Sequence, residues 1–317
     1  MSGCAGMAGT IGHVKQHFYS SSWIDRAAQL RLDADWLRER AADPESVFAP
    51  VWQDRSLVTT TDVPAAGLLR AAELPAQLLA KELVFLGLAE GGPACFALLL
   101  PNAPEPDPSW LDGAATFGDL RRLGPVMAPQ DAGLLAYARA VAHWHATHRF
   151  CGACGAATDS LNGGWLRRCS DTGCGRQHFP RTDPAIIVRV VHGERILLGR
   201  QASWPEHRYS VLAGFVEPGE SLEDAVRREV MEETGIVCDD VRYVSAQPWP
   251  FPASLMLGFS AVAATDTITL GDEELEDARW FSRQQIVAAV EAGELRLSPQ
   301  ISISRSLIDS WIDRRPV

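Results

Sequence analysis

The N-terminal half of the chain carries two stretches in which hydrophobic residues recur at helical spacing. They cover residues 23–40 and 130–148 and predict two amphipathic helices. Their apolar anchors are Leu30, Trp36, Leu37, Leu134, Leu135, Tyr137, Ala138, Val141 and Trp144. Between the two stretches, residues 47–61 are rich in β-branched and aromatic residues and predict short strands.

A hairpin is predicted in the same half. Residues 83–89 and 94–100 are apolar and flank the sequence Glu-Gly-Gly-Pro at 90–93, which favours a tight turn. The prolines between Pro101 and Pro108 predict a loop. No catalytic motif is present here, so we expect a small α+β domain that supports a partner surface.

The C-terminal part alternates strand and helix patterns. Strands are predicted at 186–191, 195–198, 241–245, 254–263 and 278–281, and helices at 283–291 and 303–314. The first two strands flank His192-Gly193-Glu194 and form a predicted hairpin. This order predicts an α+β protein whose last domain is an α/β/α sandwich around a mixed sheet.

One further helix is predicted between the hairpin and the later strands. Ser221 has the character of an N-cap, and Asp224 three residues on is a weak variant of the capping box. The helix should run from Leu222 to Thr234, and Gly235 is a suitable stop because glycine readily adopts the left-handed conformation.

The acidic residues of this helix lie on an unexpected face. Leu222, Val226 and Val230 mark its buried side, yet Glu229 and Glu233 fall within the same stripe and Glu232 flanks it. Carboxylates near a helix C-terminus also repel the helix dipole. A solvated Glu-rich helix end is one explanation; divalent cations, which take carboxylate oxygens, are another.

Composition narrows the classes of protein. The chain is 46% hydrophobic and 22% charged, as in soluble domains, and no apolar run approaches the roughly 20 residues that span a bilayer. The N-terminal sequence MSGCAGMAGTIGHVKQHF has no continuous apolar segment, so we expect no secretory signal, no membrane partner and a cytoplasmic location. The net charge of −11 disfavours broad binding to nucleic acids.

Four of the seven cysteines cluster in one stretch and predict a zinc ribbon. They are Cys151, Cys154, Cys169 and Cys174. The first pair forms a Cys-X-X-Cys-Gly knuckle, whereas the second has four intervening residues where two are usual. Four thiolates leave a zinc ion no open position, so one structural Zn²⁺ per chain is expected; buried free thiols are the alternative. We expect His143, His145 and His148 to pack against a neighbouring layer rather than bind metal.

The segment from Gly214 to Ile236 resembles the Nudix box. Gly214, then Glu220 after five residues, then Arg228-Glu229-Val230-Met231-Glu232-Glu233-Thr234-Gly235-Ile236 after seven more, is a complete match to its pattern. The resemblance implies a Nudix hydrolase, which cleaves a nucleoside diphosphate linked to another group.

A second segment resembles the motif of the NADH pyrophosphatases within that superfamily. Residues 247–254 match the sequence QPWPFPxS, and Ser245 precedes them with Ala246 intervening. The zinc ribbon belongs to the same NudC-type family, and the resemblance covers about residues 110–317. It implies hydrolysis of NADH or NAD⁺ to AMP and nicotinamide mononucleotide, removal of the NAD cap from RNA 5′ ends, and a homodimer.

The resemblance also implies roles for individual residues. Glu229, Glu232, Glu233, Glu274 and the carbonyl of Ala213 match the ligands of roughly two to three Mg²⁺ or Mn²⁺ ions per site. Glu233, and after it Glu232, match the catalytic position, and Glu220 with Arg228 an internal ion pair. The substrate-binding positions are Phe179, Phe215, Gln247, Pro248, Trp249, Pro250, Phe251, Pro252, Ala253, Ser254, Ser304 and Arg121, with Arg122 as alternate. Gly164 stands where the family can carry a substrate-contacting acid.

Three alternatives stay open at this point. The chain could hydrolyse another dinucleotide such as ADP-ribose or a diadenosine polyphosphate, or keep the fold as a non-catalytic RNA-binding protein. The ribbon could itself bind nucleic acid, since Arg167, Arg168, Arg176 and Arg181 are basic. The expected organisation is a flexible segment at 1–22, an α+β domain at 23–148, the ribbon at 149–178 and the Nudix domain at 179–317.

Overall fold

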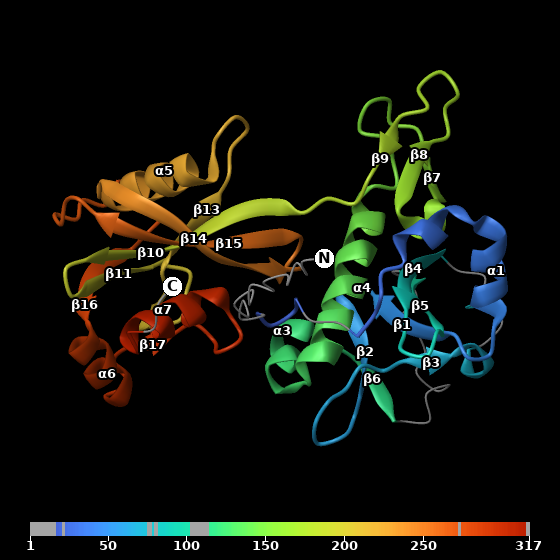
Figure 1. The fold of residues 1–317 in the computed structure, drawn as a ribbon, viewed down its shortest axis with the longest axis horizontal. Coiled ribbons are helices and arrows are strands. Elements are labelled where there is room, and N and C mark those ends of the chain that lie inside the picture. The colour runs from blue at the N-terminus through green and yellow to red at the C-terminus, as the bar shows by residue number, and fades with distance from the viewer. Residues whose placement is uncertain are drawn as a thin grey trace, which may run out of the picture.

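The computed structural model describes residues 17–20, 23–74, 78, 82–101, 114–271 and 274–314. Two lobes, each built on a mixed β-sheet, lie side by side, and a small three-stranded sheet projects from the N-terminal lobe (Figure 1). The predicted loop at 101–108 falls almost wholly outside the described residues. Among those residues, no helix is both long and apolar enough to cross a membrane.

The N-terminal lobe is a six-stranded sheet with helices on both faces. The strand order is β4-β5-β1-β2-β6, with β3 paired to β1. The strands are β1 (Val47–Trp52), β2 (Arg55–Thr59), β3 (Leu69–Arg70), β4 (Glu82–Leu88), β5 (Ala94–Leu100) and β6 (Ala115–Gly118). The helices are α1 (Ala34–Ala42), α3 (Leu120–Leu123) and α4 (Pro129–Thr147). The predicted hairpin at 83–100 and the helix at 130–148 are confirmed.

The predicted helix at 23–40 is wrong over its first half. A short 3₁₀ helix, Ala28–Leu32, precedes α1, and the chain turns at Asp33 between them. Asp33 is extended, and its side chain accepts a hydrogen bond from the backbone N–H of Trp36 at 2.9 Å. An N-cap of this kind ends one segment and begins the next, so the apolar anchors belong to two short helices.

The C-terminal lobe is also a six-stranded sheet with helices on both faces. Its sheet has the order β14-β15-β10-β11-β16, with β13 paired to β10. The strands of this sheet are β10 (Asp183–His192), β11 (Arg195–Arg200), β13 (Leu212–Phe215), β14 (Cys238–Trp249), β15 (Ser254–Ala263) and β16 (Asp277–Ser282). A separate two-stranded sheet pairs β12 (Arg208–Tyr209) with β17 (Arg296–Leu297). Helix α5 (Leu222–Thr234) covers one face, and α6 (Arg283–Glu291) and α7 (Ile303–Ile312) cover the other. The mixed-sheet sandwich predicted for this part is confirmed.

The two sheets share one topology. In each, the first two strands form an antiparallel pair, the third pairs with the first, and a later hairpin places its second strand parallel to the first. In each, the last strand pairs antiparallel with the second. Val47 and Val51 face α4 as Ile187 and Val191 face α7. The N-terminal lobe therefore repeats the fold of the C-terminal lobe, with α1 on the face that corresponds to α5.

Residues 17–20 lie between the lobes and are packed, contrary to the expectation of a flexible segment over all of 1–22. Tyr19 is buried, and its ring contacts those of Trp249 and Phe251 edge-on, with centroids 6.0 and 5.7 Å away. The buried ring of His17 bonds through Nε2 to the Ser245 hydroxyl at 2.6 Å. Apolar burial of this kind is the reason the segment has a fixed place.

Candidate active site and zinc ribbon

Helix α5 carries the acidic cluster, and local signals set its ends. The Ser221 hydroxyl accepts a hydrogen bond from the N–H of Asp224, as an N-cap should, and Gly235 ends the helix in the left-handed conformation at φ 68°. Ala225, Val226 and Val230 are buried against the sheet. The predicted helix bounds are confirmed, so the acids of its last turns have fixed positions.

Arg228 organises the loop and the helix into one unit. Its guanidinium donates to both carboxylate oxygens of Glu220, at 2.5 and 2.9 Å, and to the backbone carbonyl of Phe215 at 2.9 Å. It also donates to Glu229 at 2.9 Å and to Glu232 at 3.0 Å. The predicted pair of Glu220 and Arg228 is present, and its bidentate geometry ties the start of the box to the helix.

The electrostatics of the cluster favour a cation. Burial, together with the charges of Glu232 and Glu274, raises the pKa of Glu229 above its usual value despite the opposing effect of Arg228. The hydrogen bonds from Arg228 instead hold the pKa of Glu220 at about 2. Glu220 is therefore a fixed anion that serves the loop, whereas Glu229 sits among like charges that a divalent ion would relieve.

A cavity of about 350 Å³, which we call the acidic cavity, lies beside this cluster. Glu229, Glu274, Ala213 and Phe215 line it, together with Ser254 from the second motif. Glu232 does not line it: this residue is exposed and bonded to Arg228. Glu233 is buried, with 2% of its surface exposed, on the side of α5 that faces the sheet. The donor set, carboxylates and one carbonyl, has the chemistry that Mg²⁺ and Mn²⁺ bind.

The cavity also contains residues that the sequence did not point to. Ala185 and Met256 line it, and Gln201 donates from Nε2 to Glu274 at 3.2 Å. Met256 was detectable in principle, because side chains two apart on a strand share a face and Ser254 begins β15. Gln201 lies beyond the end of β11 and had no such signal.

Phe179 and Phe215, predicted to stack on a base, are both exposed. Phe179 is 61% exposed and Phe215 is 60% exposed. Phe215 lines the acidic cavity, and Phe179 lies just before the linker into β10. Large apolar side chains held out in this way are not core residues, and ligand stacking stays a prediction for both.

Two residues of the second motif make contacts that hold the fold together. The side chain of Gln247 is fully buried and donates to the carbonyls of Phe18 and Ile301, while its Oε1 accepts from the N–H of Ile303. Phe251 is buried against Tyr19. Gln247 also lines the cavity that contains Trp249 and Met256, and substrate contact stays a prediction for both residues. They join the N-terminal segment and α7 to the motif.

Most of the other motif residues line cavities. β14 runs beyond the strand predicted at 241–245 and includes Gln247, Pro248 and Trp249, so the connection to β15 is confined to the residues between Trp249 and Ser254. A second cavity of about 400 Å³, which we call the aromatic cavity, is lined by Trp249, Met256, Arg121 and Ser304. Met256 also lines the acidic cavity. Ser304 is buried and bonds to the Ser210 hydroxyl at 2.7 Å. Pro248, Pro250, Ala253 and Ser254 line a third cavity, and Pro252 is exposed.

The four ribbon cysteines converge on one point. Their sulfur atoms all lie within 4.8 Å of one another, with Cys151 and Cys174 3.8 Å apart and Cys154 and Cys169 3.4 Å apart. A tetrahedral Zn–S site at about 2.3 Å bond length needs sulfur separations of about 3.8 Å. Backbone N–H groups of Ala153 and Cys154 lower the pKa of Cys151 to about 6, whereas burial raises the pKa of Cys169 to about 12, so the support for zinc comes from the converging sulfur atoms. The residues therefore fit a structural zinc ion.

The longer second knuckle closes by its own turn. Asp171 accepts through its side chain from the N–H of Gly173 at 2.8 Å and through its carbonyl from the N–H groups of Cys174 and Gly175, at 3.1 and 2.8 Å. The corresponding bond in the first knuckle joins the N–H of Gly155 to the carbonyl of Cys151 at 2.8 Å. The extra residues thus form a capped loop outside β7 (Thr158–Leu161), β8 (Leu166–Cys169) and β9 (Gln177–His178) without displacing the sulfur atoms.

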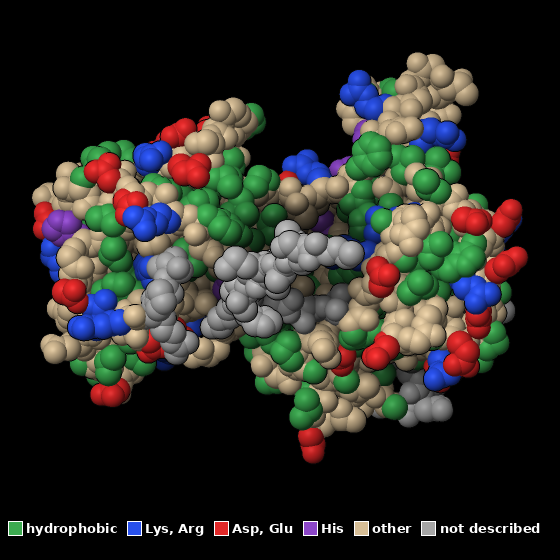
Figure 2. Space-filling view, in the orientation of Figure 1, with side chains coloured by type: hydrophobic (Ala, Val, Ile, Leu, Met, Phe, Trp, Pro, Cys, Tyr) green, Lys and Arg blue, Asp and Glu red, His purple; other side chains and the backbone are tan. Residues whose placement is uncertain are grey.

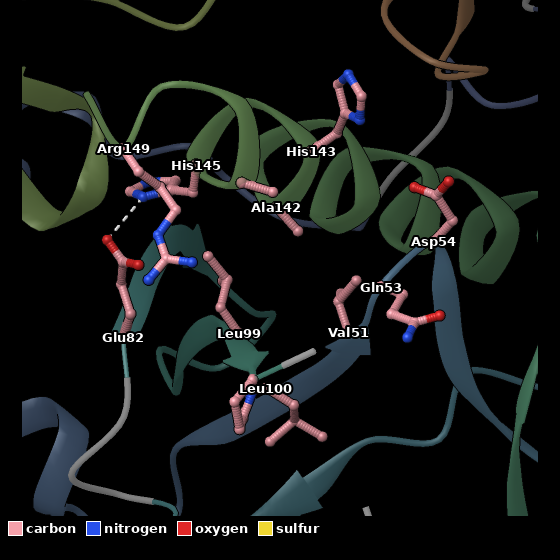
Figure 3. A pocket seen from close by; sticks show the side chains of 12 residues that line it. Val51, Gln53, Asp54, Glu82, Leu99, Leu100, Ala142, His143, His145 and Arg149 are labelled. Atoms are coloured by element: carbon pink, nitrogen blue, oxygen red, sulfur yellow. Dashed lines mark hydrogen bonds and ion pairs between the residues drawn. The ribbon is translucent and has the colours of Figure 1, made fainter. Parts of the chain in front are cut away.

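The histidines before the ribbon do not converge on a metal. Figure 3 shows His143 at one end of a cavity in the N-terminal lobe, and His145 with Arg149 and Glu82 at the other. His145 is buried and bonds to Glu82 and to the carbonyl of Gly164, both at 2.8 Å. Among the described residues, the four cysteines are the only compact group of three or more potential metal-ligand side chains. The expected packing role of His145 is confirmed.

Gly164 has a structural reason to lack a side chain. Its φ is +86°, and a Cβ atom would lie 2.8 Å from a methyl carbon of Val84. An acid at this position would require both strain and a shift of β4. The acid that the family can carry here has no room in this chain.

Gly214 is explained by its approach to the acidic helix. A Cβ atom on Gly214 would lie 1.9 Å from the carboxyl carbon of Glu229. We expect Gly214→Ala to move that carboxylate while leaving the fold intact, and to raise the Mg²⁺ or Mn²⁺ concentration for half-maximal activity by about 10- to 100-fold, the scale for disturbed metal ligands. A metal titration measures this. Gly193→Ala, which has open space for a Cβ but is strained at φ +56°, controls for a general loss of stability, and an unchanged titration of Gly214→Ala would contradict the prediction.

Comparisons with known proteins cover most of the chain. Three family profiles match in succession: "NADH pyrophosphatase-like rudimentary NUDIX domain" at residues 45–144, "NADH pyrophosphatase zinc ribbon domain" at 146–179 and "NUDIX domain" at 180–301. The first agrees with the repeated topology of the N-terminal lobe.

Similar proteins are found in a bacterium and in a mammal. The chain is 40% identical over 298 residues to "NAD-capped RNA hydrolase NudC" of Mycobacterium tuberculosis strain H37Rv, covering 90% of this chain and 92% of that protein. It is 34% identical to "NAD-capped RNA hydrolase NUDT12" of Homo sapiens, covering 95% of this chain and 74% of that protein. A NUDIX hydrolase structure from Nitrosomonas europaea aligns with a TM-score of 0.43 at 20% identity, covering 53% of this chain and 92% of that one.

Proposed function

Because this chain belongs to the NudC-type family of Nudix hydrolases, we propose that it hydrolyses the pyrophosphate of NADH and NAD⁺ to AMP and nicotinamide mononucleotide. The same site would remove the NAD cap from RNA 5′ ends, which is the activity that the names of its relatives state for those proteins. One observation carries the proposal: the acidic cavity of the box adjoins an aromatic cavity, and Met256 lines both.

This arrangement suits a dinucleotide. The acidic cavity would receive the pyrophosphate, with Phe215 at its rim for one base. The adjoining cavity, lined by Trp249 and Met256, would receive the other nucleoside. A base stacked on an aromatic side chain gains roughly 1–3 kcal/mol regardless of its identity, so two such positions favour a substrate with a base at each end.

Different residues of the chain would have different roles in this hydrolysis. Divalent cations, when bound by Glu229, Glu274, their neighbours in the box and the carbonyl of Ala213, would neutralise the pyrophosphate and activate water. Glu233 would accept the proton of the attacking water. Arg228 would hold the loop by its bonds to Glu220 and to the Phe215 carbonyl, so that the ring of Phe215 keeps its place.

We propose roughly two to three Mg²⁺ or Mn²⁺ ions per active site and one structural Zn²⁺ per chain. The four converging sulfur atoms support the zinc ion, and the acidic donor set supports the hard cations. Elemental analysis of purified protein and activity assays with each metal after chelation would count and distinguish them. Activity that survives complete removal of divalent ions would reject the catalytic metals.

A cytoplasmic location and a homodimer complete the proposal. Four free thiols at a ribbon site suit a reducing compartment. The exposed ring of Phe179, next to the linker between ribbon and catalytic domain, would complete the site of a second copy. Light scattering that gives the mass of one chain at assay concentrations would reject the dimer, and fractionation that finds the protein outside the cytoplasm would reject the location.

The function is tested by a side-by-side comparison of substrates. We expect kcat/KM for NADH, NAD⁺ and NAD-capped RNA to exceed kcat/KM for ADP-ribose and diadenosine polyphosphates by at least about tenfold, since only about 1.4 kcal/mol of differential binding is needed. A preference for ADP-ribose would favour the second candidate, a Nudix hydrolase of another dinucleotide. No hydrolysis of any of them would reject both.

The two exposed phenylalanines give a separate prediction. Phe215→Ala and Phe179→Ala should each lower kcat/KM for NADH by about 5- to 150-fold, the equivalent of roughly 1–3 kcal/mol for the stacking of one base, whereas Phe→Tyr should retain most activity. Metal affinity should not change, because no carboxylate is altered. Phe150→Ala, at an equally exposed phenylalanine of the ribbon, is the control. Full activity of both alanine variants would contradict stacking.

A further inference from the structure

The turn that follows β11 contacts a residue of the acidic cavity through one side chain, that of Gln201. The Nε2 atom of Gln201 donates a hydrogen bond to Oε1 of Glu274 at 3.2 Å. Glu274 lines the acidic cavity, whereas Gln201 is not among the described residues that line it. Any effect of Gln201 on a bound cation would therefore pass through Glu274.

Backbone hydrogen bonds hold this turn against the loop that carries Glu274. β11 and β16 lie side by side (Figure 1) and pair as far as Arg200 and Asp277. Beyond this last pair, the N–H of Glu276 donates to the carbonyl of Arg200 at 2.9 Å, and the two side chains form an ion pair. The N–H of Trp204 closes the turn on the carbonyl of Gln201 at 3.0 Å. The backbones that carry the amide and the carboxylate therefore keep one separation.

The side chain of Glu274 has more freedom than its backbone. The next residue, Leu275, is 7% exposed and packs in the core beneath α5, which anchors the loop. Glu274 itself is exposed. Ordering a glutamate side chain costs up to about 2 kcal/mol of rotamer entropy. The hydrogen bond from Gln201 restricts the carboxylate before a cation arrives, so that less of this cost falls on cation binding.

The donor to Glu274 is uncharged. Figure 2 shows acidic and basic side chains beside one another on the catalytic lobe. The acids of the box follow this pattern, since Glu229 and Glu232 both accept hydrogen bonds from Arg228. A guanidinium orients a carboxylate, but its positive charge repels a divalent cation nearby. The amide of Gln201 takes one oxygen of Glu274 and leaves the negative charge for a cation.

We propose that Gln201 is a positioning residue for the divalent cations of the active site, which holds the carboxylate of Glu274 in the direction that a cation needs. The inference rests on the proposed function, which takes Glu274 as a metal ligand. Removing a hydrogen bond to a metal ligand typically lowers metal affinity by about 10- to 100-fold. The bond in this protein joins partly exposed groups at 3.2 Å, so we expect the lower end of that range.

The test is a double-mutant cycle on Mn²⁺ binding to substrate-free protein, measured by the EPR signal of free Mn²⁺. Gln201→Met keeps the length of the side chain but removes the amide, and should raise the Kd for Mn²⁺ about tenfold. In protein that already carries Glu274→Ala, the same change should alter this Kd by less than about twofold, because the group that Gln201 positions is absent. At saturating Mn²⁺, kcat of Gln201→Met for NADH should return to within about threefold of the wild type.

Arg200→Gln is the matched control, because it removes the ion pair with Glu276 from the same turn without a change to Gln201 or Glu274. It should leave the Kd for Mn²⁺ within about twofold of the wild type, as surface substitutions usually do. Melting temperatures of all variants verify the fold.

Three results would overturn the inference. They are an unchanged Kd in Gln201→Met, an effect of Gln201→Met that persists in full beside Glu274→Ala, and an equally large effect of Arg200→Gln. Because Mn²⁺ binding is measured without substrate, the proposed function fails separately. Protein that passes the cycle but hydrolyses no dinucleotide rejects the proposed function and keeps the positioning role, whereas protein that hydrolyses NADH but fails the cycle rejects only this inference.

Discussion

Replacing Glu233 with Gln is expected to lower kcat for NADH by about 100-fold or more, the scale for removal of a general base. Glu233 lies in the last turn of α5, 2% exposed, one position before the buried Thr234. Glutamine has nearly the same shape, so the packing of the helix should persist while the charge and the proton acceptor are removed. KM should change far less than kcat, because the effect concerns the transition state.

The matched control for this prediction lies on the same helix. Glu223→Gln changes an exposed acid in the first turn of α5 and should leave kcat within about twofold, as surface substitutions usually do. Glu232→Gln separates the two candidate bases, because Glu232 is exposed and bonded to Arg228. Turnover within about threefold of wild type in folded Glu233→Gln protein, with a large decrease in Glu232→Gln, would move the role to Glu232.

Replacing Cys151 with Ser is expected to remove the zinc ion and to destabilise the lobe that carries the ribbon. Structural zinc in small peptides contributes about 10–16 kcal/mol of apparent binding free energy, and most of it stabilises the fold. The wild-type protein should hold about one zinc per chain, and the variant almost none. Elemental analysis and thermal unfolding measure the two effects.

The zinc prediction has an internal control and a distinct signature. Cys238→Ala removes a buried thiol of the catalytic lobe and should keep the zinc. Loss of zinc should affect the ribbon and its interactions with the N-terminal lobe first, since Arg167 of β8 bonds to Glu82 of β4 at 2.6 Å. Well-folded wild-type protein without zinc would show that the four thiols pack without a metal.

The N-terminal lobe explains why the chain is longer than its catalytic unit. It repeats the sheet topology of the catalytic lobe, but α1 takes the face that α5 occupies there, and α1 carries no box. Its helix α4 instead reaches the second motif: Arg139 is buried and donates through Nε to the carbonyl of Pro250 at 2.8 Å. The lobe therefore holds the second motif in place through α4.

The sequence by itself determined the features that depend on short stretches of chain. Ser221 and Gly235 define the ends of α5 because their hydrogen bonds join residues within one turn. The spacing of Cys151 and Cys154 sets two sulfur atoms on one tight knuckle for the same reason. The box, the ribbon and strands β10, β11, β14, β15 and β16 could therefore be predicted, whereas β12, β13 and β17 were not.

Only the tertiary structure decided which motif residues line cavities and which are buried in contacts between distant parts of the chain. Gln247 bonds to the carbonyl of Phe18, 229 positions away, and Phe251 packs on Tyr19, so both side chains join the motif to the N-terminal segment. The repeat of the N-terminal lobe was also hidden, because pairing between strands needs only apolar residues of suitable shape and leaves no fixed motif. Burial depends on partners far apart in the chain, and a linear pattern does not specify which partners meet.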